Sequence, residues 1–164
     1  MRKLMILSWF LLSGVVVWAC GDKLMLVMGL RPSQLKASRP AAILGYTRLD
    51  SPSSKLIRDL QLQPAVKKAG HRFEFVEDLE KLDGALKTGK YDLVLADMAV
   101  AGELGPRLNS APSRPVMMPV AYNAAKADQS AAQKRFHCLL KVPGGPEQSL
   151  EAIDQAMQWK AKRP

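Results

Sequence analysis

The sequence predicts a three-layer, doubly wound α/β domain, in which helices cover both faces of a mainly parallel β-sheet. Two observations predict this fold class. Short apolar runs alternate along the chain with stretches of about 10–15 residues whose apolar side chains recur at helical spacing. The connections between them are short, as in successive βαβ units. At 164 residues, the chain has room for one such domain.

Five apolar runs are the predicted strands of this sheet. They are Ala41–Tyr46, His71–Val76, Tyr91–Ala96, Pro115–Ala121 and His137–Val142. The second run alternates apolar and polar residues, which indicates a half-buried edge strand, whereas the third run is typical of a central strand. Pro119 has no N–H to donate to a neighbouring strand. A further run, Lys23–Met28, predicts an extra N-terminal strand whose place in the sheet the sequence does not assign.

The stretches between these runs are the predicted helices. Ser51 and Pro52 are a suitable cap and first residue for a helix that ends at Gly70, and Pro64 is expected to kink or restart it. A second helix begins at Asp78, with Leu79, Leu82 and Leu86 on its apolar side. The remaining helices are predicted at Val100–Asn109, Ala124–Phe136 and Glu147–Lys160.

The N-terminus has the pattern of a secretory signal peptide. A short cationic start, Met1–Lys3, precedes the charge-free apolar run Leu4–Ala19. We therefore predict a signal peptide at residues 1–19, a single domain at residues 20–164 and a periplasmic or secreted location. An uncleaved anchor is an alternative, although the run is shorter than the roughly 20 residues that span a bilayer. A lipoprotein is another, because Val17–Cys20 resembles a lipoprotein box in which Cys20 is lipidated.

The chain has two cysteines, Cys20 and Cys138, and export would place both in an oxidising compartment. Thiols tend to pair in an oxidising compartment, so the sequence predicts a Cys20–Cys138 disulfide. The alternative is that Cys138 is a buried thiol that packs as a small hydrophobic residue. Neither cysteine belongs to a C-x-x-C pair, which argues against a redox catalyst.

The chain is strongly basic, with 24 Lys and Arg against 15 Asp and Glu and a formal net charge of +9. The cations are scattered along the sequence and have no interleaved aromatic residues. Together with the predicted export, this pattern predicts that nucleic acid is not a partner. Lysines at helix C-termini and cations on solvated faces account for most of the positive charge. A weak electrostatic association with envelope surfaces stays open.

One segment resembles a known family. Tyr91–Met98 reads YDLVLADM, which resembles the third strand of response-regulator receiver domains. That strand ends in the aspartate that accepts a phosphoryl group, and Asp97 stands at its position. Arg114–Met118 resembles the family's fourth strand, and Leu140–Pro143 resembles the end of its fifth, with Lys141 as the lysine. The resemblance implies a flavodoxin-like strand order for most of the predicted domain.

The sequence also departs from the receiver pattern. Receivers bind Mg²⁺ with an acidic pair after the first strand, but Gly45–Arg48 contains no carboxylate and Asp50 is the next one. The hydroxyl expected at the end of the fourth strand is replaced by Val120. Lys141 is separated from Pro143 by one residue. These departures predict no metal site and no cofactor.

The resulting interpretation is a degenerate, non-catalytic receiver-like domain. Asp97 is then a relic or an ion-pair partner of Lys141, and an acid/base enzyme using these two residues is the weakest reading. Thr47, Asp97, Asn123 and Lys141 are the candidate site, because they follow strands whose carboxyl ends meet at one edge. We expect protein–protein interaction with an unidentified envelope protein. Membrane contact is expected only if the N-terminus is uncleaved or Cys20 is lipidated.

Two alternatives share this fold. The first is a single-lobe periplasmic binding protein that holds a small anionic ligand at the same edge of the sheet. The second is a lipid-anchored envelope protein.

Overall fold

The computed structural model describes residues 37, 39–48 and 62–163 of the chain. These residues contain one five-stranded sheet with the order β2-β1-β3-β4-β5, and all neighbouring strands are parallel. The strands are β1 (Ala42–Tyr46), β2 (Arg72–Val76), β3 (Leu93–Asp97), β4 (Val116–Tyr122) and β5 (Leu140–Val142). This strand order and the parallel pairing confirm the predicted doubly wound fold class.

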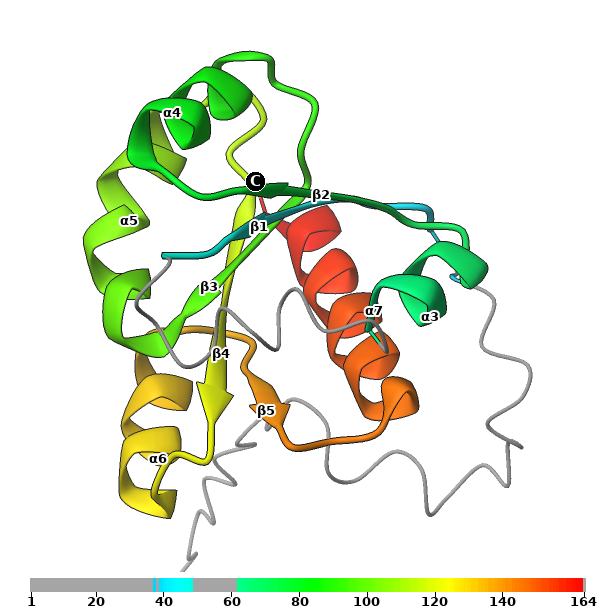
Figure 1. The fold of residues 1–164 in the computed structure, drawn as a ribbon, viewed down its shortest axis with the longest axis vertical. Helices are drawn as coiled ribbons and strands as arrows, with labels where there is room; N and C mark the ends of the chain where they lie inside the picture. Colours follow the sequence, from blue (N-terminus) through cyan, green and yellow to red (C-terminus); the bar gives the residue numbers. More distant parts are fainter. Residues whose placement is uncertain (1–36, 38, 49–61, 164) are drawn as a thin grey trace, which may run out of the picture.

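Helices lie on both faces of the sheet (Figure 1). They are α3 (Leu62–Lys68), α4 (Leu79–Lys87), α5 (Met98–Ser110), α6 (Lys126–Arg135) and α7 (Pro146–Lys162). The helices α3 and α7 cover one face, and α4, α5 and α6 cover the other. The helices run antiparallel to the strands, so their C-termini lie toward the amino ends of the strands.

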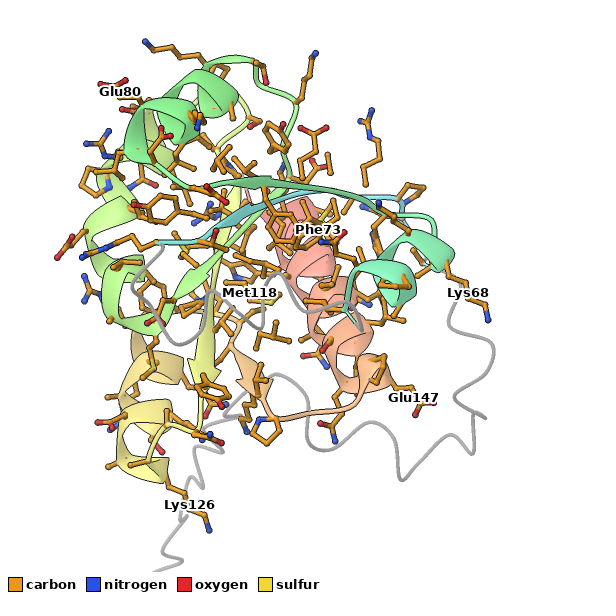
Figure 2. All side chains as sticks on the ribbon, in the orientation of Figure 1. Lys68, Phe73, Glu80, Met118, Lys126 and Glu147 are labelled. Carbon is orange, nitrogen blue, oxygen red and sulfur yellow. The ribbon has the colours of Figure 1, made fainter. Side chains whose placement is uncertain are left out.

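Alternate residues of the central strands enter two separate apolar cores. Leu95 of β3 and Met118 of β4 pack toward α7, where Ile153 is fully buried (Figure 2). Val94 packs on the opposite face, in the cluster that contains Leu82 of α4. Because both faces are covered, a central strand of this sheet must be apolar at every position. This requirement explains the continuous apolar run in β3.

Two polar side chains fix the start of β3 to its neighbours. The Ala42 N–H of β1 donates to Asp92 Oδ2 over 3.0 Å, and Lys160 Nζ of α7 lies 2.7 Å from Asp92 Oδ1. The Tyr91 hydroxyl donates to the Glu74 carboxylate of β2. Burial and this hydrogen bond raise the pKa of Tyr91 to about 12. The Tyr-Asp pair that precedes β3 therefore joins β1, β2, β3 and α7.

The helix α5 contains a proline, and a neighbouring helix partly compensates for it. Pro106 has no N–H to donate to the Gly102 carbonyl one turn earlier. Arg135 Nη2 of α6 lies 3.5 Å from that carbonyl oxygen. A Cβ atom at position 102 would lie 2.8 Å from the Arg135 guanidinium, so glycine leaves room for this approach. The contact joins α5 to α6.

One predicted helix lies partly outside the described residues, and two other details of the prediction differ from the structure. The helix predicted from Ser51 is described only as α3, because residues 49–61 lie outside the described part of the chain. The last strand begins at Leu140 and not at His137, since Leu139 would face Pro119, which has no N–H to donate. Leu79, predicted on the apolar side of its helix, is 42% exposed, because it occupies the first turn of α4, directly after the Asp78 cap.

Cys138 is buried in the core beside Val120 and Leu140, with 1% of its surface exposed. The described residues contain no disulfide bond. Cys20 lies outside them, as do the predicted signal peptide at residues 1–19 and the predicted strand Lys23–Met28. The Cys20–Cys138 disulfide therefore stays a prediction. Within the described ranges, no helix combines the length and apolar character needed to cross a membrane.

We expect Asp92→Ala to lower the free energy of unfolding by about 1–3 kcal/mol, because it leaves the buried Ala42 N–H without its acceptor. Asp92→Asn keeps an acceptor oxygen at this position and loses only the charge that faces Lys160. It should cost clearly less. Urea unfolding of the two variants and the parent measures the difference. Equal losses for Ala and Asn would assign the stabilisation to the ion pair instead.

His71 makes the stability of the fold depend on pH. It is 4% exposed, and its Nδ1 accepts the Ala41 N–H over 3.1 Å. Burial lowers the pKa of His71 below its ordinary value of 6.5, and the nearby Asp154 only partly opposes this effect. The unfolded chain therefore takes up the proton first as pH falls. The contribution of His71 to stability is complete above about pH 6.5 and is lost progressively below it.

His71→Asn removes this titration while an amide oxygen can still accept the Ala41 N–H. We expect the melting temperature of the parent to fall more steeply than that of His71→Asn between neutral and mildly acidic pH. Thermal unfolding followed by circular dichroism over this range measures both slopes. Parallel slopes would mean that His71 does not titrate differently in the two states.

Candidate functional site

The four residues predicted for the site lie at the carboxyl edge of the sheet. Tyr46 of β1 pairs with Ala96 of β3, and the residues that follow them are Thr47 and Asp97. Lys141 of β5 pairs with Ala121 of β4. Asn123 directly follows β4, and its N–H donates to the Val142 carbonyl of β5 over 2.8 Å. The structure therefore brings residues from four different strand ends to one edge.

Asp97 has a defined structural role at this edge. It is the N-cap of α5, and its Oδ1 accepts the Ala99 N–H over 2.8 Å. A carboxylate at a helix N-terminus satisfies a backbone donor and interacts favourably with the helix dipole. Its side chain is half-buried. This capping role fits the predicted structural reading of Asp97, while its predicted ion pair with Lys141 stays a prediction.

Thr47 is a buried polar residue at the same edge. Only 1% of its surface is exposed, and its N–H donates to the Val76 carbonyl of β2 over 3.0 Å. In the described part of the protein, its Oγ1 is buried without a hydrogen-bond partner. A buried hydroxyl in this state costs free energy. The sequence placed Thr47 in the site, but the burial of its hydroxyl could not be predicted.

Lys141 and Asn123 form the β4–β5 side of the edge. The Lys141 side chain is half-buried, and Asn123 is exposed. Asn123 has a φ angle of 45°, a left-handed conformation that asparagine tolerates better than most residues. Tyr122, just before it, is one of the few large apolar side chains in the described residues with substantial exposure, at 40%. This side of the edge therefore presents an aromatic ring and an amide to solvent.

The chemistry available at the edge is limited. Magnesium needs several oxygen ligands, and at this edge β3 ends with the carboxylate of Asp97, whereas β1 is followed by Thr47 and Arg48, which have no carboxylate. In the ranges that the structure describes, no three His, Cys, Asp or Glu side chains are close enough to hold a metal ion together. Thr47, Lys141 and the N-terminus of α5 offer donors to an anion, although Asp97 places a negative charge among them.

The sequence did not indicate one hollow of the surface. An open pocket of about 300 Å³ lies between the C-terminal halves of α4 and α5. Its lining includes Asp83 and Arg107, which form an ion pair between these helices. That ion pair raises the pKa of Arg107 above its already high value, with its hydrogen bond to Asp83 as the main cause. This pocket is not part of the carboxyl edge, because the helix C-termini face the other way.

Comparison with known proteins gives matches in structure only. No protein-family model and no curated protein sequence matches the chain. An atypical orphan response regulator, whose structure is described as revealing a phosphorylation-independent regulatory mechanism, superposes with a TM-score of 0.54. The two are 15% identical, and the match covers 72% of this chain and 96% of that one.

Two further structures give similar matches. One is a protein of Burkholderia pseudomallei named as pilus assembly-related, with a TM-score of 0.52, 18% identity, and coverage of 76% of this chain and 94% of that one. The other is a CheY-like receiver domain of Methanospirillum hungatei, with a TM-score of 0.50, 14% identity, and coverage of 74% and 98%. At these identities the matches establish the fold. The chain has a response-regulator receiver-like, flavodoxin-like fold.

Proposed function

We propose that this chain is an exported, non-catalytic receiver-like domain that binds a protein partner in the bacterial envelope through its carboxyl edge. The proposed contact surface consists of Tyr122, Asn123 and Lys141, and the same edge contains Asp97, which caps α5, and the buried Thr47. The proposal covers three properties: the place where the chain acts, the absence of phosphoryl transfer, and the surface that is recognised. The first is supported by the sequence pattern of residues 1–19.

The observation that carries the proposal is the state of Asp97. Its carboxylate caps α5, and residues Gly45–Arg48 provide no carboxylate next to it at the end of β1. Phosphoryl transfer to an aspartate requires a metal ion to neutralise the developing charge. The carboxyl edge therefore lies where receiver domains have their site, and its residues favour recognition over phosphoryl transfer.

Two structural neighbours give the proposal a context. The atypical orphan response regulator is described as having a phosphorylation-independent regulatory mechanism. The Burkholderia pseudomallei protein is named as related to pilus assembly. Both share this fold with the chain, so a receiver-like fold is compatible with regulation that does not depend on phosphorylation and with a role related to pilus assembly.

Site-specific photo-crosslinking in the producing cell tests the proposal. A photoreactive residue at Asn123 should give one discrete protein adduct, because this exposed position lies at the centre of the β4–β5 side of the edge. Asp97→Asn should leave the adduct unchanged, since asparagine also caps helices and α5 stays in place. Lys141→Glu should reduce the adduct severalfold. The adduct is measured by immunoblotting and identified by mass spectrometry.

The matched control carries the photoreactive residue at Gln158, an exposed position on α7. Equal crosslinking from both positions would contradict a specific carboxyl-edge contact. Loss of the adduct in folded Asp97→Asn, or its dependence on a phosphodonor, would contradict the non-catalytic part of the proposal. Recovery of the adduct only from the cytoplasmic fraction would contradict export.

The buried hydroxyl of Thr47 favours one second candidate function, the binding of a small anion at the same edge. Thr47→Val separates the two. If the hydroxyl has no ligand, valine should raise the free energy of unfolding by up to about 1 kcal/mol, because it removes an unsatisfied buried group of similar shape. If an anion binds there, phosphate or a small carboxylate should raise the melting temperature of the parent but not that of Thr47→Val. Thermal-shift measurements decide between them.

A further inference from the structure

The fold gathers most of the cations of the described residues at the amino edge of the sheet. One group lies in the last turns of α3, α4, α5 and α7. These residues are Lys67, Lys68, Lys87, Arg107, Lys160 and Lys162. A second group precedes or begins the strands β1 to β4. These residues are Arg39, Arg72, Lys90 and Arg114. Together with Arg163 we call them the basic amino edge. In the sequence the same residues are spread over more than half of the chain.

Contacts between the segments show that the middle of this surface is continuous. Asp92 connects the start of β3 to β1 and to Lys160. The Val116 N–H, at the start of β4, donates to the Asp92 carbonyl over 2.9 Å. The loop at Gly89 faces the loop before β4 so closely that a Cβ atom at position 89 would lie 3.4 Å from the Pro112 side chain. Lys90 and Arg114 therefore extend from adjoining loops.

An aromatic side chain lies within this basic surface. The Arg163 guanidinium carbon lies 4.0 Å from the centroid of the Trp159 ring, and the His137 ring contacts the same tryptophan in a tilted arrangement, with 4.0 Å between the ring centroids. Partial burial and the proximity of Arg114 lower the pKa of Arg163. Two cationic groups and a partly exposed indole thus lie in the same region of this surface. Tryptophan is enriched where a protein meets a membrane–water interface.

The attraction of cations to helix C-termini explains only part of this arrangement. It accounts for the first group, but not for Arg39, Arg72, Lys90 and Arg114, which lie outside the helices. All four are exposed. Acidic residues are instead concentrated at the other edge, where Glu80, Asp128 and Glu147 lie in the first turns of α4, α6 and α7. Figure 2 shows Lys68 at the end of α3, and Glu80 and Glu147 at the starts of their helices, all extending into solvent.

The described chain enters the domain at this same basic edge. The Ala37 N–H donates to the Ala69 carbonyl over 3.1 Å, directly after Lys67 and Lys68 of α3. The sequence before Ala37 contains the apolar run Leu4–Ala19 and Cys20. A segment retained in or anchored to a membrane at either place would therefore join the domain on the side of its exposed cations.

We propose that the basic amino edge binds the anionic phospholipid surface of a membrane, with Lys90, Arg114 and Arg163 at its centre. The cations come from many separate helix ends and loops, so they match a broad anionic surface better than a single small ligand. The domain then presents the opposite, carboxyl edge away from the lipid. This proposal does not depend on the protein partner proposed for the carboxyl edge and can fail separately from it.

Vesicle cosedimentation with the full chain tests the proposal. The vesicles contain phosphatidylcholine alone or a mixture with phosphatidylglycerol, so the N-terminal apolar run contributes to both and the difference reports the charge. We expect binding to the mixed vesicles to exceed binding to phosphatidylcholine and to decrease as salt is raised. Lys90→Gln/Arg114→Gln should weaken this excess by at least about tenfold, since each cation near an anionic surface contributes roughly 1 kcal/mol of attraction.

The matched control is Lys81→Gln/Lys126→Gln, which removes the same charge from exposed positions near the starts of α4 and α6, at the carboxyl edge, and should change the excess severalfold less. Circular dichroism and melting temperatures show whether both double variants are folded. If Lys90→Gln/Arg114→Gln does not fold, Lys68→Gln/Arg72→Gln is used in its place. Equal weakening by the amino-edge pair and the Lys81/Lys126 pair would overturn the proposal, because net charge alone would then explain binding. Tighter binding to polyglutamate or to duplex DNA than to the mixed vesicles would overturn it in favour of an acidic protein or a nucleic acid.

Discussion

The placement of Asp92 is the constraint on which the rest of this structure depends. One carboxylate accepts a β1 backbone N–H and also faces a lysine of the last helix, so it fixes the central strand pair and the helix α7 against each other. The carboxylate is half-buried, and both of its oxygens are engaged. Asp92 also affects the carboxyl edge. Because the strands are parallel and in fixed register, the alignment of their starts determines which residues lie side by side at their ends.

The segment Tyr91–Met98, which resembles the third strand of receiver domains, stabilises the fold at both of its ends. Tyr91 and Asp92 tie the start of β3 to three other elements, and Asp97 caps the helix that follows it. Each polar position of this run stabilises the fold, so its resemblance to a phosphoacceptor strand does not by itself indicate phosphoryl transfer. This dual use separates the fold of a receiver from its chemistry.

Much of the fold was predictable because apolar runs and helical spacing report burial directly. The apolar runs predicted the five strands, and the alternation in β2 predicted its edge position. Apolar residues at helical spacing, such as Leu82 and Ile153, predicted the buried faces of α4 and α7. The four site residues could be assigned to one edge, since parallel strands end together. The burial of the Thr47 hydroxyl, the exposure of Leu79 and the late start of β5 depend on tertiary packing and register. The grouping of the cations depends on topology, which places distant segments side by side.

The approach of Arg135 to the Gly102 carbonyl has a consequence for how this protein can vary. A side chain at position 102 would occupy the space of the guanidinium, and a shorter residue at position 135 would leave the carbonyl opposite Pro106 without that donor. The effects of substitutions at positions 102, 106 and 135, on two different helices, therefore depend on one another. Replacing Pro106 by a residue with an N–H would satisfy the Gly102 carbonyl within α5 and leave the Arg135 guanidinium free to move away from a side chain at position 102.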